Sequence, residues 1–193
     1  MLQVPATTLN PPKPVYGKGS ASVSNGSWNL RDVKFLTNFP KIVFKVFMIA
    51  VPDGPHTVIK GPALLQETFK GFQDVMQRSY STATIQFVGM CPDPQFDRGE
   101  AEARISMEKA KAKGANFVML FLEKSNTPAY SVFKHLADCE YGMHSLCVVY
   151  KGKPFSPQYW GNIAMKINLK AGGMNHSVDG VEQIMKDTLV LGA

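Results

Sequence analysis

The sequence predicts an α/β fold with a four-stranded parallel sheet, helices on both faces of the sheet, and an irregular N-terminal arm. Two observations carry this prediction. The chain has 193 residues, of which 45% are hydrophobic and 19% are charged, and this composition suits one domain with a substantial core. Beyond residue 40, almost purely apolar segments alternate with amphipathic ones in the order β-α-β-α-β-α-β-α. Strands that are apolar on both faces are typical of a parallel sheet between two helix layers.

Residues 1–39 are expected to form an arm or linker. The run Pro11-Pro12-Lys13-Pro14 and the Gly/Ser-rich stretch that ends at Gly26 disfavour a regular helix or a central strand. Trp28 and Leu30 follow, and their apolar side chains could dock the arm on the domain.

The predicted strands are runs rich in Val, Ile, Leu and Phe that end at turn residues. They span residues 41–51, 83–90, 116–122 and 146–150. The predicted helices have helix-forming composition or apolar residues at helical spacing. They span residues 62–80, 99–113, 127–141 and 157–171. The third helix begins with Thr127 as N-cap and Pro128 in the first turn, and Gly172 ends the last one.

The segment 177–193 has two interpretations. Asp179 and Glu182 have capping-box spacing and precede an apolar stripe, which favours a helix from about Asp179 packed on the domain. Residues 188–191 could equally form a strand.

Composition also excludes several classes of function. The formal net charge is +6, and residues 1–60 carry seven Lys or Arg against two acids, so an anionic partner is permitted. Three cysteines without C-x-x-C spacing and four scattered histidines predict neither a metal site nor a disulfide framework. With no signal peptide and no membrane-length apolar segment, we expect a cytoplasmic protein without membrane contact.

Two pairs of residues at helical i,i+4 spacing are candidates for an anion site. Tyr130 and Lys134 share a face of the third predicted helix, and Lys166 and Lys170 share a face of the last one. The paired lysines repel by about 0.2–0.5 kcal/mol in an isolated helix, so convergence on an anion would explain them. They could hold a phosphate at a helix N-terminus beyond the carboxyl ends of the strands, with Tyr130 stacked on a base. From the residues alone, a solvated lysine face is the more usual explanation of this spacing.

These residues belong to a longer pattern. It comprises Asn-Thr-Pro-Ala-Tyr-x-x-x-Lys at 126–134, Gly-Met-x-x-x-Cys at 142–147 and Asn-Ile-Ala-Met-Lys-Ile-Asn-x-Lys-x-Gly-Gly-x-Asn at 162–175. The pattern resembles the MID domain of eukaryotic Argonaute proteins, above all fungal Argonautes of the quelling type, and Trp28-Asn29-Leu30 resembles the linker before that domain. The resemblance implies a Rossmann-like MID domain at 40–176 that anchors the 5′-phosphorylated end of a small guide RNA.

The resemblance also implies roles for individual residues. Tyr130 would stack on the first guide base and contact its phosphate, while Lys134, Lys166, Lys170 and the backbone N–H of Cys147 would bind the phosphate. A loop would face the edge of the first base; it consists of Lys124, Ser125, Asn126, Thr127 and Pro128. In eukaryotic members a lysine takes the place of a metal ion, so no metal and no other cofactor is expected.

One position departs from the family pattern. The family commonly has a phosphate-binding glutamine where this chain has Leu146, so that contact is either absent or supplied by His144 or Ser145.

Residues 177–193 resemble the start of the neighbouring PIWI nuclease domain, up to a point just before its first catalytic aspartate. The resemblance therefore implies a non-catalytic binding module whose partners are a guide RNA and the PIWI domain. Two alternatives remain open from the residues alone. One is a nucleotide-binding α/β enzyme that uses a crevice at the carboxyl edge, with His135 or His144 as catalyst. The other is a protein-interaction lobe whose basic face is incidental.

Overall fold

The computed structural model describes residues 6, 10–37, 43–50, 62–77, 85–91, 99–122, 128–149 and 155–189. Within these ranges one parallel four-stranded sheet has the strand order β3-β2-β4-β5. Its strands are β2 (Phe44–Ala50), β3 (Ile85–Cys91), β4 (Phe117–Leu122) and β5 (His144–Val149). The predicted parallel sheet is confirmed, and β5 lies at its edge.

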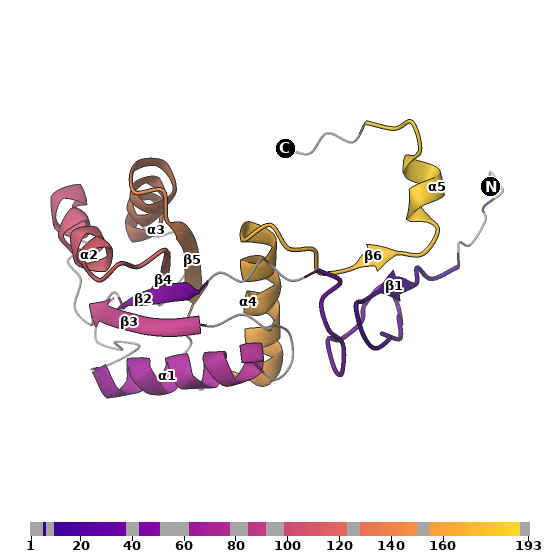
Figure 1. The fold of residues 1–193 in the computed structure, drawn as a ribbon, viewed down its shortest axis with the longest axis horizontal. Helices are drawn as coiled ribbons and strands as arrows, with labels where there is room; N and C mark the ends of the chain where they lie inside the picture. The colour runs from indigo at the N-terminus through magenta and orange to yellow at the C-terminus, as the bar shows by residue number, and fades with distance from the viewer. Residues whose placement is uncertain are drawn as a thin grey trace, which may run out of the picture.

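Four helices cover the two faces of this sheet, as predicted (Figure 1). They are α1 (Pro62–Val75), α2 (Glu100–Ala112), α3 (Pro128–Lys134) and α4 (Pro157–Lys170). The side chain of Ser156 caps α4 by accepting a hydrogen bond from the backbone N–H of Tyr159. The predicted N-cap Thr127 lies outside the described residues.

The third predicted helix is not α-helical to its end. After Lys134 it widens into a π-helix, η3 (His135–Glu140). The backbone N–H of Tyr141 consequently bonds the carbonyl of Leu136, five residues earlier, at 2.9 Å. Such wide turns are rare and are often found near functional sites.

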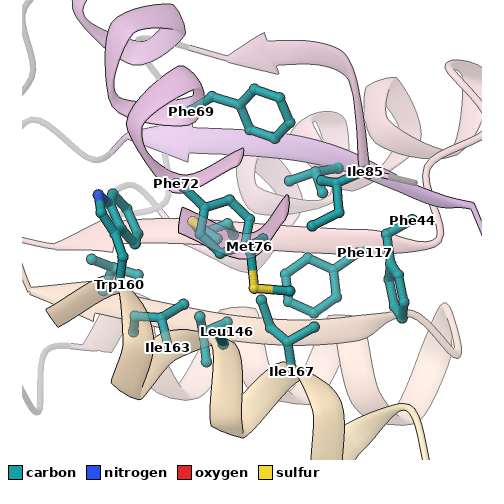
Figure 2. Packing of buried hydrophobic residues seen from close by; sticks show 14 of the residues in the cluster. Phe44, Phe69, Phe72, Met76, Ile85, Phe117, Leu146, Trp160, Ile163 and Ile167 are labelled. Atoms are coloured by element: carbon teal, nitrogen blue, oxygen red, sulfur yellow. The ribbon is translucent and has the colours of Figure 1, made fainter. Parts of the chain in front are cut away.

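The core is divided into two layers by the alternation of side chains along each strand. In β4, Phe117, Met119 and Phe121 pack against α1 and α4, and the side chains between them pack against α2, α3 and η3. Figure 2 shows the first layer, where Phe72 of α1 and Trp160 of α4 meet with ring centroids 5.1 Å apart. Burial on both faces explains why the central strand β4 is apolar at every position.

The arm is largely irregular, as predicted, but one short part of it is paired. Its β1 (Pro14–Val15) pairs antiparallel with β6 (Ser177–Val178), and Thr37 exchanges backbone hydrogen bonds with Met174. The indole N–H of Trp28 donates to the Tyr16 hydroxyl within the arm at 2.7 Å, while Leu30 packs against the core of the domain as expected. The pairing of β1 was not predicted, because its partner lies at the other end of the described chain.

The predicted tail helix is present but short. It is α5 (Val181–Met185), and Figure 1 shows it beyond β6, away from the parallel sheet of the domain, whereas we expected it to pack on that domain. Thr188 and Leu189 are neither helical nor in a strand, and residues 190–193 lie outside the described residues. No helix in the described ranges is long and apolar enough to cross a membrane.

Candidate functional site

The candidate lysines gather beside the edge strand β5. Ser145 and Cys147 of this strand pair with Val118 and Leu120 of β4, and so lie partway along the strand rather than at its carboxyl end. One face of β5 is covered by α3 and η3, and the other by α4 (Figure 1). Side chains from both helix layers can therefore meet at this edge.

Lys134, the last residue of α3, is held against β5 by three acceptors. Its Nζ donates to Ser145 Oγ at 2.5 Å and to the Ser145 carbonyl at 3.3 Å, and pairs with Asp138 Oδ2 at 3.4 Å. The Ser145 hydroxyl in turn donates to Asp138 Oδ1. The lysine head group is thus fixed in position on one side of the edge strand.

Lys166 and Lys170 approach the same place from α4. Burial lowers the pKa of Lys170 below its usual value, and the positive charge of Lys134 lowers it further. The charges of Lys134, Lys166 and Lys170 all act on the Cys147 thiol. Lys134 and Lys170 thus lie close enough for their charges to interact, and the charges of all three predicted lysines reach Cys147. We call Lys134, Lys166 and Lys170 the lysine cluster.

The Cys147 thiol is not suited to nucleophilic chemistry. Burial raises its pKa to about 12, and the charge of Asp138 adds to that shift, while the three lysines only partly oppose it. A thiol with this pKa is protonated at neutral pH, whereas the thiolate is the reactive form. Cys147 can instead contribute its backbone N–H as a hydrogen-bond donor.

The backbone N–H of Cys147 points outward from the sheet. The carbonyl of Ser145 accepts from Lys134, and the backbone of Val149 bonds the hydroxyl of Tyr159 on α4. Residues two apart in a strand direct their backbone groups to the same side. Cys147 lies between these two, so its N–H faces the same edge as the lysine cluster.

One part of the predicted geometry differs from the structure. The sequence placed all three lysines around one helix N-terminus; Lys134 does lie in the second turn of the continuous helix formed by α3 and η3, but Lys170 is the last residue of α4. A lysine in the last turn of a helix is favoured by the negative end of the helix dipole. The positive charge that α4 brings to the site therefore comes from its side chains and not from a helix N-terminus.

Tyr130 lies one turn before Lys134 in α3, and its side chain is 38% exposed. Its ring is available to a ligand next to the lysine cluster. Of the predicted base-facing loop, only the exposed Pro128 is described; Lys124, Ser125, Asn126 and Thr127 lie outside the described residues.

The three residues before Cys147 have different surroundings. Leu146 is buried in the layer beneath α1 and α4. The exposed His144 lies against Phe44 on that same layer, with ring centroids 6.2 Å apart. Ser145 is buried on the other side, where Lys134 and Asp138 use its hydroxyl. Of the two proposed substitutes for the family glutamine, only Ser145 touches a member of the lysine cluster.

A pair of buried asparagines fixes the end of α4 that carries Lys170. The Asn168 amide donates to the Asn175 side chain at 2.9 Å and to the Thr37 carbonyl at 3.1 Å, and the Asn175 amide donates to the Met165 carbonyl at 3.1 Å. Sequence reasoning noted these asparagines only as part of a motif. The signal for a structural role was Asn168 itself, a polar residue one turn after Ala164 on the buried face of α4.

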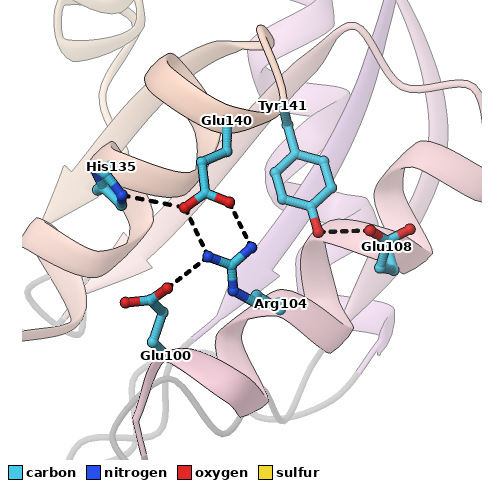
Figure 3. Close-up of polar contacts among 6 residues, drawn as sticks. All are labelled: Glu100, Arg104, Glu108, His135, Glu140 and Tyr141. Carbon is cyan, nitrogen blue, oxygen red and sulfur yellow. Dashed lines mark hydrogen bonds and ion pairs between the residues drawn. The ribbon is translucent and has the colours of Figure 1, made fainter.

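A second polar cluster lies on the far side of η3 (Figure 3). Arg104 of α2 bonds both carboxylate oxygens of Glu140 and also pairs with Glu100, while His135 lies 3.1 Å from Glu140. These bonds hold the Glu140 pKa below its usual range, chiefly through Arg104. The network joins α2 to η3 and occupies His135, which the enzymatic alternative needed beside the lysines.

Lys166 and Lys170 are exposed and Lys134 is partly buried, so the lysine cluster lies at the surface of the described part of the chain. A solvent-open cavity of about 690 Å³ lies at the opposite end of α4, where Leu30, Val75 and Pro157 line it. Among the described residues, no group of three His, Cys, Asp or Glu side chains is arranged to hold a metal ion.

Comparison with known proteins identifies relatives with this architecture. The Piwi domain family model matches residues 117–193. The Argonaute protein of Schizosaccharomyces pombe is 29% identical over 196 residues, which cover 92% of this chain and 22% of that protein. The chain therefore spans about a fifth of the length of this curated relative.

Two crystal structures have the same fold. The MID-PIWI domains of N. crassa QDE-2 match with a TM-score of 0.58 and 22% identity, over 76% of this chain and 39% of that one. The Kluyveromyces polysporus Argonaute, solved with a guide RNA, matches with a TM-score of 0.62 and 19% identity, over 92% of this chain and 22% of that one.

Proposed function

The chain is homologous to the Argonaute proteins and has an Argonaute MID/PIWI-like fold, and on that premise we propose that it binds the 5′-phosphorylated terminal nucleotide of a small guide RNA. In this proposal the chain anchors the guide in a cytoplasmic RNA-silencing complex. Lys134, Lys166 and Lys170 bind the phosphate together with the backbone N–H of Cys147, and Tyr130 stacks on the first base.

One observation carries the proposal: the lysines of two different helices meet beside an outward-facing backbone N–H. Placing ammonium groups close together is unfavourable, and the positive charge of Lys134 adds to the effect of burial in lowering the pKa of Lys170. A terminal phosphate carries about −1.5 to −2 charge at neutral pH and several acceptor oxygens. It offsets the repulsion and accepts charge-assisted hydrogen bonds from several donors at once.

The base is recognised separately in this proposal. Tyr130 is half-exposed one turn before Lys134, so its ring can stack on the nucleotide whose phosphate the lysines hold. Stacking on an aromatic side chain contributes about 1–3 kcal/mol per base. The fungal relative solved with a guide RNA supports RNA as the ligand.

We propose binding without catalysis, with the PIWI domain as the neighbouring partner. The two histidines available to an enzyme point elsewhere, because His135 pairs with Glu140 and His144 lies against Phe44. The buried Cys147 thiol is protonated. The site thus offers positive charge and backbone donors and lacks an activated nucleophile among the described residues.

The test is a titration of the chain with a short RNA that carries a 5′-phosphate, against the same RNA with a 5′-hydroxyl. We expect tighter binding of the phosphorylated RNA and a preference that shrinks as salt is raised. Lys134→Gln should reduce the preference by about tenfold or more, because a hydrogen bond to a charged group is lost. Lys109→Gln removes an equal charge from the exposed face of α2 and is the matched control. Equal binding of the two RNAs by the unmodified chain would overturn the proposal.

A further inference from the structure

We propose that Asp138 is a positioning residue that competes with the 5′-phosphate for Lys134, and so limits how strongly the site prefers a phosphorylated end. This inference rests on the proposed function. It concerns one carboxylate inside a cluster of positive charge, which the sequence did not single out. In the free protein Asp138 acts as an internal substitute for the phosphate.

The first argument is the number of donors. A lysine ammonium has three N–H groups and no acceptor. The Nζ of Lys134 already has three acceptors within reach, namely Ser145 Oγ at 2.5 Å, the Ser145 carbonyl at 3.3 Å and Asp138 Oδ2 at 3.4 Å. A phosphate oxygen that binds Lys134 must therefore replace one of them.

The second argument identifies the acceptor that leaves. Asp138 is the most distant of the three acceptors and the only charged one. Its side chain is 40% exposed, so its carboxylate can turn toward water. Ser145 is fully buried and cannot move away without disturbing β5. Asp138 is thus the partner that the phosphate displaces.

The third argument concerns what holds Asp138 in place before that happens. The Ser145 hydroxyl has one proton, which it donates to Asp138 Oδ1, and it accepts from Lys134. A buried serine thereby directs both groups toward each other. Asp138 also opposes the lowering of the Lys170 pKa, which indicates that its charge reaches the α4 side of the cluster as well.

Asp138 can affect phosphate binding in two opposite ways, by ordering Lys134 and by repelling the phosphate, and their relative size decides whether its removal strengthens or weakens binding. The two hydrogen bonds to the buried Ser145 keep the head group of Lys134 in place without Asp138, so Lys134 remains available to the phosphate. Repulsion between the carboxylate and a doubly charged phosphate, in contrast, acts whenever the ligand is bound. Removing the charge of Asp138 should therefore strengthen phosphate binding.

The experiment compares Asp138→Asn with Glu182→Gln, an exposed carboxylate on α5. For Asp138→Asn we expect 5′-phosphorylated RNA to bind about three to ten times more tightly. Binding of the 5′-hydroxyl RNA should change no more than in Glu182→Gln. Asp138→Glu, which restores the charge, should return the phosphate preference toward that of the unmodified chain.

An unchanged or lower phosphate preference in Asp138→Asn would overturn the inference. If the unmodified chain itself shows no preference, the proposed function fails, and the two failures are thus distinguishable. A structural role for Asp138 alone would lower stability and leave the ratio of the two affinities unchanged.

A measurement on the unmodified chain covers the case in which Asp138→Asn does not fold. The carboxyl ¹³C signal of Asp138 should move when a nucleoside 5′-monophosphate is added, since its lysine partner is withdrawn. The same nucleoside without a phosphate should leave the signal in place. A signal that ignores the monophosphate while other signals of the lysine cluster respond would contradict the inference.

Discussion

Asn168 and Asn175 share a buried hydrogen bond of 2.9 Å, and through it the last turn of α4 is tied to the segment that leads into β6. Asn168 also reaches the Thr37 carbonyl in the arm. The position of Lys170, two residues further along α4, therefore depends on contacts with both ends of the described chain.

Asn168→Ala should lower the free energy of unfolding by about 1–3 kcal/mol, because buried hydrogen-bonding groups lose their partners. Denaturation in urea measures the effect. Asn162→Ala is the matched control, since Asn162 lies on the exposed face of the same helix. Equal stabilities of the two variants would show that the buried network does not stabilise the fold.

Tyr130→Ala should weaken binding of 5′-phosphorylated RNA by the loss of about 1–3 kcal/mol of stacking free energy. Because the ring is exposed, the unfolding transition should change little. Tyr130→Phe keeps the aromatic face and should retain most of the affinity. Fluorescence anisotropy with labelled RNA gives both values, and a Phe variant as weak as the Ala variant would argue against stacking.

Lys170→Gln should stabilise the fold at neutral pH by less than about 1 kcal/mol while it weakens phosphate binding. The reason is that burial and the charge of Lys134 both disfavour the charged amine, as its lowered pKa indicates. Lys109→Gln, on exposed α2 surface, should change neither property. A Lys170→Gln variant that is less stable than the unmodified chain would contradict this explanation.

The lowered pKa of Lys170 also predicts how the stability difference between Lys170→Gln and the unmodified chain varies with pH. The folded chain releases the Lys170 proton below the ordinary value of 10.5, which applies to the unfolded chain. Between these two pKa values the unfolded chain binds more protons, so the stability of the unmodified chain rises with pH there. The advantage of Lys170→Gln should therefore shrink as pH approaches 10.5, which thermal denaturation at a series of alkaline pH values would reveal.

Glu140→Gln should lower the melting temperature slightly at neutral pH, because Arg104 loses its doubly bonded partner. The pKa of Glu140 is lowered in the folded state, chiefly by Arg104. Its contribution is therefore present above the ordinary carboxyl pKa and is lost as pH falls through the lowered value. Melting curves from about pH 7 to about pH 2 should show the two proteins converge, whereas Glu102→Gln on the same helix as Arg104 should behave like the unmodified chain.

The local pattern of apolar and turn residues along the sequence was sufficient to predict the parallel sheet and its four covering helices. Each strand of the sheet is short, apolar and bounded by turn residues, so local sequence and tertiary burial point to the same structure. The π-helix after Lys134 was not predictable in this way, because the spacing of Phe133, Leu136 and Ala137 suits an ordinary helix.

The sequence predicted which residues belong to the candidate site better than it predicted where in the fold these residues lie. Spacing placed Lys134 and Lys170 on helix faces correctly, but it could not tell which part of the sheet those faces approach. The general tendency of α/β folds to bind ligands at the carboxyl edge did not indicate that Lys134 contacts β5 at Ser145. Asp138 was missed because its importance depends on Ser145, a contact between two elements that sequence spacing does not reveal.

The pairing of β1 with β6 also has a consequence for the order of folding. A ribosome releases the chain from its N-terminus, so Pro14 and Val15 emerge long before Ser177 and Val178. Each strand of the four-stranded sheet pairs with a strand at most two places away along the chain, so the sheet can assemble as its strands are synthesised, whereas the pairing of β1 with β6 must await residues 177–178. During synthesis, Tyr16 and Trp28 consequently remain without the His176 ring on which they finally pack. Until Ser177 and Val178 have been synthesised, the arm is therefore the part of the described fold that stays incomplete and accessible to a chaperone.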